Sequence, residues 1–352
     1  MRPFMRDVLV AVALLAGWTL GSEPRESVQR APVPQQLRPA PQSVWLLAVG
    51  DVNLGRVVGQ EILKGDTLYP FRYVADTLAH YDVVFGNLEC QLSDQRGETQ
   101  SPKNNLVFTG PPAGSRSLRQ ANMTIVSTAN NHALDYGFVA HHQTIANLEE
   151  SGIVFAGTSR DSAGLFIPTV FTRRGMRFAL FACTDIMNMT NPVWRRYVAA
   201  ADTGRLLPAI RKVRDSVDCV VVSYHGGNEY ADAPTRRTRE LARQIAGAGA
   251  DLVLGHHPHV PYGLSVEGTT LVAYSLGNFV FYQPQRYWTQ RSFALAAELV
   301  RDTAGVHIRA TRILPVVAGR QPRFLAAGAS ADTIVTRVRM MSSQQAVETV
   351  SW

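Results

Sequence analysis

From residue 44 to residue 155 the chain alternates between short apolar runs and segments with helical periodicity. The apolar runs lie at 44–49, 83–85, 124–127 and 153–155, and the helical patterns lie at 70–80, 116–122 and 141–151. Strands separated by helices of about 10–15 residues are typical of βαβ units, because parallel strands need a crossover connection. The alternation therefore predicts an α/β fold with a largely parallel sheet.

The second half of the chain mixes such units with hairpins. Hairpins are predicted at 169–171 with 177–181 and at 264–266 with 270–274, and a final pair of strands at 293–300 and 306–311. A helix is predicted at 206–216, followed by an apolar strand at 218–224. A second helix is predicted at 236–249, followed by an apolar strand at 251–254.

A polar side chain of the kind that binds metals follows five of the predicted strands. The five ends read Gly50-Asp51, Gly86-Asn87-Leu88-Glu89, Asn130-Asn131-His132, Tyr224-His225 and Gly255-His256-His257-Pro258-His259. Glycine is expected to let the backbone turn sharply as it leaves the sheet, so that the next side chain points into the crevice. Carboxylate, amide and imidazole groups without a thiolate form a mixed nitrogen and oxygen ligand set, which predicts a metal site.

The last of these ends carries the densest group of candidate ligands. His257 and His259 are one residue apart, and from a loop they can reach one metal or two adjacent metals. Imidazole is a common ligand of zinc, iron and manganese. Taken alone, this stretch is equally compatible with a surface loop that happens to be rich in histidine, and the other strand ends favour the metal site.

The motif series resembles that of the CapA family, which is linked to poly-γ-glutamate capsule synthesis and is related to calcineurin-like metallophosphoesterases. The resemblance covers about residues 44–315 and rests on six motifs in order, at 50–56, 86–89, 129–137, 225–230, 255–259 and 275–279. It implies a four-layer α/β/β/α sandwich of the metallophosphatase type. It also implies a site for two divalent metal ions, manganese, zinc or iron, between the strand ends.

The resemblance also implies a role for each candidate ligand. The first metal would be held by Asp51 and His259, the second by Asn131, His225 and His257, and Glu89 would bridge both. His256 is an alternative to His257, and the sequence leaves that choice open. Two departures could weaken one metal site, since Asn53 stands where metallophosphoesterases usually carry a histidine and Glu89 stands where they carry an aspartate.

Three further residues are predicted to take part in catalysis. By the same resemblance, His132 would assist the leaving group, and it could do so by protonating the leaving oxygen. Asp135 could orient His132, or it could cap the following helix. Arg56 could bind a phosphate or carboxylate through both of its terminal nitrogens, or it could be a surface arginine.

The N-terminus predicts export. Arg2 and Arg6 precede an apolar run from 8 to 21, which is the pattern of a signal peptide and is short for a membrane span. Residues 1–21 are therefore interpreted as a signal peptide or a membrane anchor, residues 22–43 as a proline-rich linker, residues 44–325 as the folded domain, and residues 326–352 as a peripheral tail. Most of the chain would lie outside the cytoplasm, whether or not the leader is cleaved.

The net charge restricts the possible binding partners, and the positions of the cysteines argue against a zinc site. The net charge of +7 rests almost entirely on scattered arginines, which argues against nucleic-acid binding but allows attraction to anionic polymers and membrane surfaces. Cys90, Cys183 and Cys219 lie in or beside apolar runs and are interpreted as small core residues, since their spacing does not suggest a zinc site.

Three functions from different classes fit these patterns. The first is an exported CapA-type protein with a two-metal site, which acts in capsule or poly-γ-glutamate synthesis together with membrane synthase partners. The second is a metal-dependent phosphoesterase that acts on an extracytoplasmic phosphate ester. The third is a non-catalytic scaffold or polymer-binding subunit of a membrane complex. The expected ligand is an anionic polymer or a phosphorylated or carboxylated molecule.

Overall fold

The computed structural model describes residues 42–303 and 305–352. The predicted leader (1–21) and the predicted linker up to residue 41 lie outside the described residues. Within the described part, no helix has the length and apolar content that crossing a membrane would require.

The strands form two large sheets. The first sheet contains β1 (Gln42–Val52), β2 (Val83–Leu88), β5 (Ile125–Ser127), β6 (Val154–Ala156), β13 (Asn278–Val280), β14 (Arg291–Asp302), β15 (Gly305–Val317) and β16 (Arg323–Phe324). The second contains β7 (Thr169–Arg173), β8 (Met176–Thr184), β9 (Cys219–His225), β10 (Leu252–His256), β11 (Leu264–Glu267) and β12 (Thr270–Ala273). A small separate pair consists of β3 (Gln91–Leu92) and β4 (Thr109–Gly110).

Each large sheet has a parallel part and at least one antiparallel edge. The strand orders are β16-β15-β14-β1-β2-β5-β6, with β13 also paired to β1, and β11-β12-β10-β9-β8-β7. Strands β1, β2, β5, β6 and β13 are mutually parallel, as are β8, β9, β10 and β12. The predicted hairpins β7–β8 and β11–β12 and the final pair β14–β15 are confirmed as antiparallel. The largely parallel sheet expected from residues 44–155 is confirmed, since β1, β2, β5 and β6 are parallel neighbours in the first sheet, and the remaining strands complete two mixed sheets.

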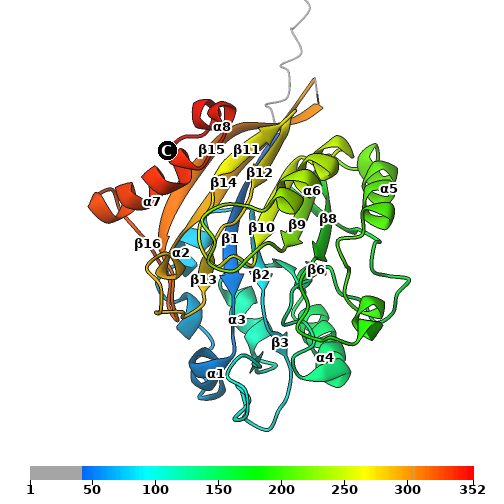
Figure 1. Cartoon of the computed structure of the whole chain (residues 1–352), viewed down its shortest axis with the longest axis vertical. Coiled ribbons are helices and arrows are strands. Elements are labelled where there is room, and N and C mark those ends of the chain that lie inside the picture. The colour runs from blue at the N-terminus through cyan, green and yellow to red at the C-terminus, as the bar shows by residue number, and fades with distance from the viewer. Residues whose placement is uncertain (1–41, 304) are drawn as a thin grey trace, which may run out of the picture. The chain divides into compact units, whose positions relative to one another are not determined.

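The sheets pack face to face, and helices cover their outer faces (Figure 1). Leu46 of β1 lies in the same buried cluster as Phe178 of β8, between the sheets. Because successive strand residues point to opposite faces, Leu47 and Phe181 instead pack against the outer helices. These helices are α1 (Arg56–Leu63), η1 (Tyr69–Phe71), α2 (Ala75–Leu78), α3 (Gly114–Gln120) and α4 (Gly137–Glu150) on the first sheet, and α5 (Thr203–Arg214) and α6 (Arg236–Gly247) on the second. The predicted four-layer α/β/β/α sandwich is confirmed.

Two helices were not predicted in their observed form. Helix α1 begins directly after the first strand end and was missed, although its buried Val58 and Ile62 are spaced as in an amphipathic helix. The helix predicted at 70–80 is instead the 3₁₀ turn η1, with Pro70 in its first turn, followed by the short α2. Two further 3₁₀ turns are η2 (Pro192–Arg196) and η3 (Trp288–Gln290).

The C-terminal segment is not peripheral, so that expectation for residues 326–352 is wrong. It forms α7 (Ala329–Met340) and α8 (Gln344–Thr349). Ile334 and Val338 are fully buried in the cluster between the sheets, and Ala346 joins them. Residues four apart lie on one helix face, and here that face is too short to stand out in the sequence.

The glycines at the strand ends do not serve the predicted role of allowing a sharp turn of the backbone. Gly50 and Gly255 lie inside β1 and β10 rather than after them, and neither has a positive φ. A Cβ atom on Gly50 would lie 1.8 Å from the Gly277 carbonyl oxygen, and one on Gly255 would lie 2.1 Å from the Tyr274 carbonyl oxygen. These glycines are required because neighbouring backbone approaches them closely, and not because the chain turns there.

The cysteine interpretation is confirmed. Cys90, Cys183 and Cys219 are all free and buried. Burial raises the pKa of the Cys90 thiol to about 12, so the thiol stays protonated at neutral pH.

Candidate metal centre

The register of the first sheet places Asp51 between two asparagines. Asp51 of β1 lies opposite Asn87 of β2 on one side and Asn278 of β13 on the other. In the second sheet, His225 of β9 lies opposite His256 of β10. Because β1 and β10 face each other across the sandwich, the ends of the parallel strands of both sheets supply polar side chains to one site.

All six predicted metal ligands lie in this site and are at most 5% exposed. They are Asp51, Glu89, Asn131, His225, His257 and His259. Such burial of carboxylates is unusual unless another group compensates their charge.

Glu89 belongs to two overlapping groups of candidate ligands. One ligand atom each from Asp51, Glu89 and His259 lie within 4.8 Å of one another, and the same holds for Glu89, His225 and His257. A third such group consists of His257, His259 and the exposed Glu229. A carboxylate shared between two groups is the arrangement that a bridging ligand between two cations needs.

Asn131 lies beside the second group. Its Oδ1 is 2.8 Å from Nε2 of His225, and its Nδ2 donates a hydrogen bond to Oδ1 of Asn188 at 3.1 Å. The amide is thereby held with its oxygen toward the candidate ligands, which is the orientation in which an asparagine binds a metal.

The two buried carboxylates have opposite pKa shifts. Burial alone would raise the pKa of Asp51, but its interactions with His256 and His259 outweigh burial and hold the pKa well below the usual range. Burial and the nearby charge of Asp51 raise the pKa of Glu89 well above its usual value. Two adjacent carboxylates without a cation between them cannot both ionise freely.

Burial lowers the pKa of both histidines of the second group. Burial and the nearby His257 hold the pKa of His225 well below its usual value. Burial and the nearby His259 lower the pKa of His257 to about 3. A neutral imidazole has a free lone pair on one ring nitrogen, as metal binding requires.

Several buried atoms of the site lack a hydrogen bond. They include Oε1 of Glu89 and Nδ1 of His257, and Oε1 of Glu89 is also 3.8–3.9 Å from ring nitrogens of His132, His225 and His259. An unsatisfied buried polar atom costs about 1–3 kcal/mol. A divalent cation accepts lone pairs from carboxylate oxygens and imidazole nitrogens, so the residues of this site fit such an ion.

The positions of His256 and His257 indicate which of the two is the candidate metal ligand. His257 belongs to two of the ligand groups, whereas His256 belongs to none. Nδ1 of His256 lies 3.2 Å from Oδ1 of Asp51, and its ring packs 5.8 Å from that of Phe85. The geometry favours His257 as the candidate ligand and His256 as a residue that positions Asp51.

His132 and Asp135 form a dyad at the edge of the site. Nδ1 of His132 is 2.8 Å from Oδ2 of Asp135, and Nε2 of His132 faces Oε1 of Glu89 at 3.9 Å. The His132 ring stacks on Phe108 at 4.2 Å, and the backbone N–H of Phe108 donates to the same Asp135 oxygen at 3.1 Å. Helix α4 begins after Tyr136 without a side-chain cap, so the carboxylate of Asp135 orients His132 and does not cap the helix.

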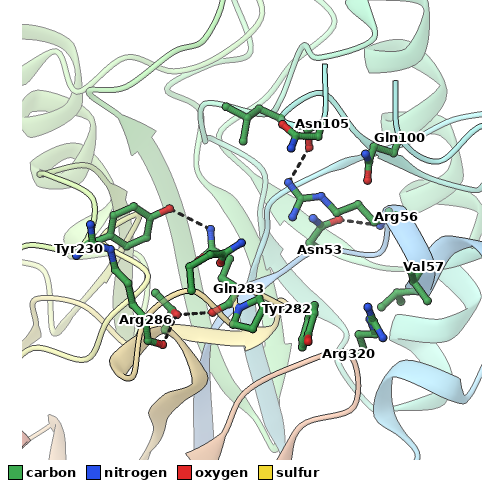
Figure 2. A pocket seen from close by; sticks show the side chains of 16 residues that line it. Asn53, Arg56, Val57, Gln100, Asn105, Tyr230, Tyr282, Gln283, Arg286 and Arg320 are labelled. Atoms are coloured by element: carbon green, nitrogen blue, oxygen red, sulfur yellow. Dashed lines mark hydrogen bonds between the residues drawn. The ribbon is translucent and has the colours of Figure 1, made fainter. Parts of the chain in front are cut away.

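Arg56 lines a cavity of about 490 Å³ and is not a simple surface residue (Figure 2). Its Nη2 donates to the Asn105 carbonyl oxygen at 2.9 Å, and its guanidinium lies 4.5 Å from the centre of the Phe108 ring. Burial lowers the pKa of Arg56, although the charges of Glu89 and Asp135 oppose this effect. Asn53 lines the same cavity, and its Oδ1 accepts a 2.7 Å hydrogen bond from the Gly55 N–H.

Two asparagines of the site were not predicted as site residues, although Asn87 lies in the predicted strand end at 86–89. Nδ2 of Asn87 lies 2.9 Å from Oδ1 of Asp51 and 3.3 Å from Oε2 of Glu89. Its one available signal was a position two residues before Glu89 in an apolar strand. Asn188 contacts Asn131 and also lies 3.3 Å from Nδ1 of His132. Asn188 is in a loop without periodicity, so no sequence signal marked it.

Four residues at the site have a left-handed backbone although they are not glycine. They are Arg56 (φ 54°), Tyr230 (φ 60°), His257 (φ 94°) and His259 (φ 60°). Such a conformation costs roughly 1–3 kcal/mol per residue and persists where the surrounding structure enforces it, often at functional sites. The strain supports a functional role for these residues.

Sequence comparisons point to capsule synthesis proteins. Residues 45–283, which include all six candidate ligands, match the family described as "Bacterial capsule synthesis protein PGA_cap". The "PGA biosynthesis protein CapA" of Bacillus subtilis is 34% identical over 69% of this chain and 63% of its own length. The "Capsule biosynthesis protein CapA" of Bacillus anthracis is 30% identical over 88% of this chain and 73% of its own length. The chain thus spans somewhat less than two thirds of the first of these relatives.

Comparison with solved structures finds distant likenesses. A putative 5'-nucleotidase from Staphylococcus aureus has a TM-score of 0.45 and 9% identity, over 85% of this chain and 58% of that protein. A 5'-nucleotidase from Candida albicans has a TM-score of 0.39 and 14% identity, over 73% of this chain and 51% of that protein.

Proposed function

The chain belongs to the bacterial capsule synthesis protein family PGA_cap, and from that membership we propose that it acts in the synthesis of an extracellular anionic polymer such as poly-γ-glutamate. In this proposal the protein is exported and works with membrane-bound synthase partners. The strand-end site is its functional centre and holds two divalent cations, manganese, zinc or iron.

The position of Glu89 carries the proposal. Its carboxylate is completely buried, belongs to two of the three groups of candidate ligands, and has one oxygen without a hydrogen bond among the described residues. A buried charge without a partner is strongly destabilising, by about 3–5 kcal/mol when one partner of an ion pair is removed. A carboxylate shared by two cations would explain why the fold tolerates this residue.

The residues then divide into two sets of ligands. Asp51 and His259 would hold the first cation, His225, His257 and Asn131 the second, and Glu89 both. Two bound cations would stabilise the charge that develops on the reacting oxygens and would favour ionisation of a water molecule at neutral pH.

The His132–Asp135 dyad supplies proton transfer. The hydrogen bond from Nδ1 to Asp135 fixes the ring so that Nε2 faces the centre. From there His132 can give a proton to a leaving oxygen, which is general acid catalysis. This dyad also favours a second candidate function, the hydrolysis of an extracytoplasmic phosphate ester.

Metal content of the full chain, measured by elemental analysis, tests the proposal. The wild-type chain should bind divalent cations that are lost in Glu89→Gln, while the exposed His142→Ala keeps them as a matched control. A wild-type chain without metal after incubation with manganese, zinc and iron would reject the centre and leave a non-catalytic, polymer-binding role. Turnover of a simple phosphate ester without any effect on polymer synthesis in the cell would favour the second candidate.

A further inference from the structure

Among the described residues, three arginines and no acidic side chain line the cavity that contains Arg56. Arg56, Arg286 and Arg320 all belong to its lining, together with uncharged residues. In Figure 2 the three arginines come from different sides of the cavity, with Arg56 from α1 and Arg286 from the loop beside Tyr230. Three positive charges around one cavity repel each other, so an anionic ligand there would relieve an unfavourable arrangement.

Each of these guanidinium groups rests on an aromatic ring and not on a carboxylate. Arg56 lies 4.5 Å from the Phe108 ring centre, Arg286 lies 4.8 Å from that of Tyr230, and Arg320 lies 4.2 Å from that of Tyr282. Among the described residues, none of the three forms an ion pair within 4.0 Å. Nε of Arg56 is in addition buried and has no hydrogen-bond partner in the part of the chain that the structure describes. Stacking holds the planar groups in place and leaves their N–H donors available for an anion.

The cavity is connected to the candidate metal centre through hydrogen bonds. Asn278 lies 2.9 Å from Nδ1 of His259 through its Oδ1, and its Nδ2 donates to Gln283 at 2.9 Å. Gln283 in turn donates to the Tyr230 hydroxyl at 3.3 Å, inside the cavity. The Tyr230 ring lies 6.0 Å from that of His259. A molecule bound in the cavity would therefore lie beside the residues that are candidate metal ligands.

We propose that this cavity binds a chain that carries several anionic groups, carboxylates or phosphates, with one group at Arg56 and others at Arg286 and Arg320. The guanidinium fork matches both kinds of anion. A volume of about 490 Å³ exceeds the need of a single small anion, since cavities of about 300–1,000 Å³ hold drug-sized ligands. The inference rests on the proposed function in that it names the class of substrate that would reach the centre.

Binding can be measured without any metal. The full chain is stripped with a chelating resin, because a soluble polycarboxylate chelator would compete for the cavity. Titration calorimetry then compares tetraglutamate with glutamate and tripolyphosphate with orthophosphate. At least one of the two longer anions should bind roughly tenfold more tightly than its monomer, as expected when further charge-assisted hydrogen bonds form. The series with the larger ratio identifies carboxylate or phosphate as the preferred anion.

Two variants locate the site. Arg320→Gln should weaken binding of the preferred longer anion roughly tenfold and leave binding of its monomer at Arg56 nearly unchanged. Arg339→Gln removes the same charge from the exposed face of α7, away from the cavity, and should change neither. The proposal would be overturned if both variants weakened binding equally. It would also be overturned if monomer and oligomer bound with equal affinity, or if neither series bound. Because the chain is free of metal throughout, loss of the metal centre alone would leave these results unchanged.

Discussion

Asn87 donates a 2.9 Å hydrogen bond to the buried carboxylate of Asp51 from the neighbouring parallel strand. The same amide nitrogen lies 3.3 Å from Oε2 of Glu89. A neutral amide thus tethers the two carboxylates, which belong to one ligand group. It adds no charge to a site that already carries two buried carboxylates.

Asn87→Asp should destabilise the metal-free chain by about 3 kcal/mol, because it replaces a donor with a third buried carboxyl group that has no cation beside it. The free energy of unfolding in urea measures the effect. Asn104→Asp, at an exposed position, should change stability by less than about 0.5 kcal/mol and serves as the control. Equal stability of the two variants would show that the hydrogen bonds of the Asn87 amide do not stabilise the pair of carboxylates.

The overlap of the ligand groups predicts different metal losses in different variants. His225→Ala removes a ligand from one group only, so it should leave one cation per chain of the two expected. Glu89→Gln removes a ligand from both groups and should lower the content of both cations. Elemental analysis after dialysis distinguishes the variants. Identical losses would mean that a single cation occupies the site.

The candidate ligands were readable from the sequence because each follows a locally apolar strand. Asp51 and His225, for example, lie near the C-terminal ends of predominantly apolar, buried strands. The four-layer packing brings these residues together. The family resemblance predicted this packing, whereas the alternation of strands and helices alone did not. The alternation over residues 44–155 predicted the correct fold class and the parallel pairing of β1, β2, β5 and β6, but it did not indicate the second sheet.

Other features depend on contacts that a single strand does not reveal. The role of Asn87 follows from its register opposite Asp51, and that of Gly255 from the close approach of the Tyr274 carbonyl. Asn188 reaches the site from a loop without a periodic pattern. Helix α7 was missed because its buried face consists mainly of two well-spaced residues, Ile334 and Val338, in an otherwise polar segment.

If the centre hydrolyses phosphate esters, His132→Ala should slow the release of an alcohol much more than the release of a nitrophenol. A poor leaving group needs the proton from His132, whereas nitrophenolate leaves without one, and general acid catalysis contributes roughly 10²–10⁴-fold. Asp135→Asn should give the same pattern with a smaller loss, because the ring keeps its place on Phe108. Metal content must stay at the wild-type level in both variants. Equal slowing of both esters would assign His132 to binding and not to proton transfer.

The backbone of His257 predicts an unusual order of stability among variants. Its φ of 94° suits glycine, so metal-free His257→Gly should be about 1 kcal/mol more stable than His257→Ala. His225, the last residue of β9, has no positive φ and provides the opposite case, since glycine there should be about 0.5–1 kcal/mol less stable than alanine. Urea unfolding of the four variants measures both differences. The same sign at both positions would contradict the strain argument.

Gly255→Ala should destabilise the fold by about 3 kcal/mol or more, because backbone and not a flexible side chain occupies the space that its Cβ would need. The Tyr274 carbonyl would have to shift, and with it the segment that leads to Asn278 and so to His259. Gly247→Ala, at the end of α6 with no atom within 4 Å of the added carbon, should instead be neutral or stabilise by up to about 1 kcal/mol. Thermal and urea unfolding of both variants compare them directly. A Gly255→Ala chain with wild-type stability and metal content would mean that the two strands can separate without disturbing the site.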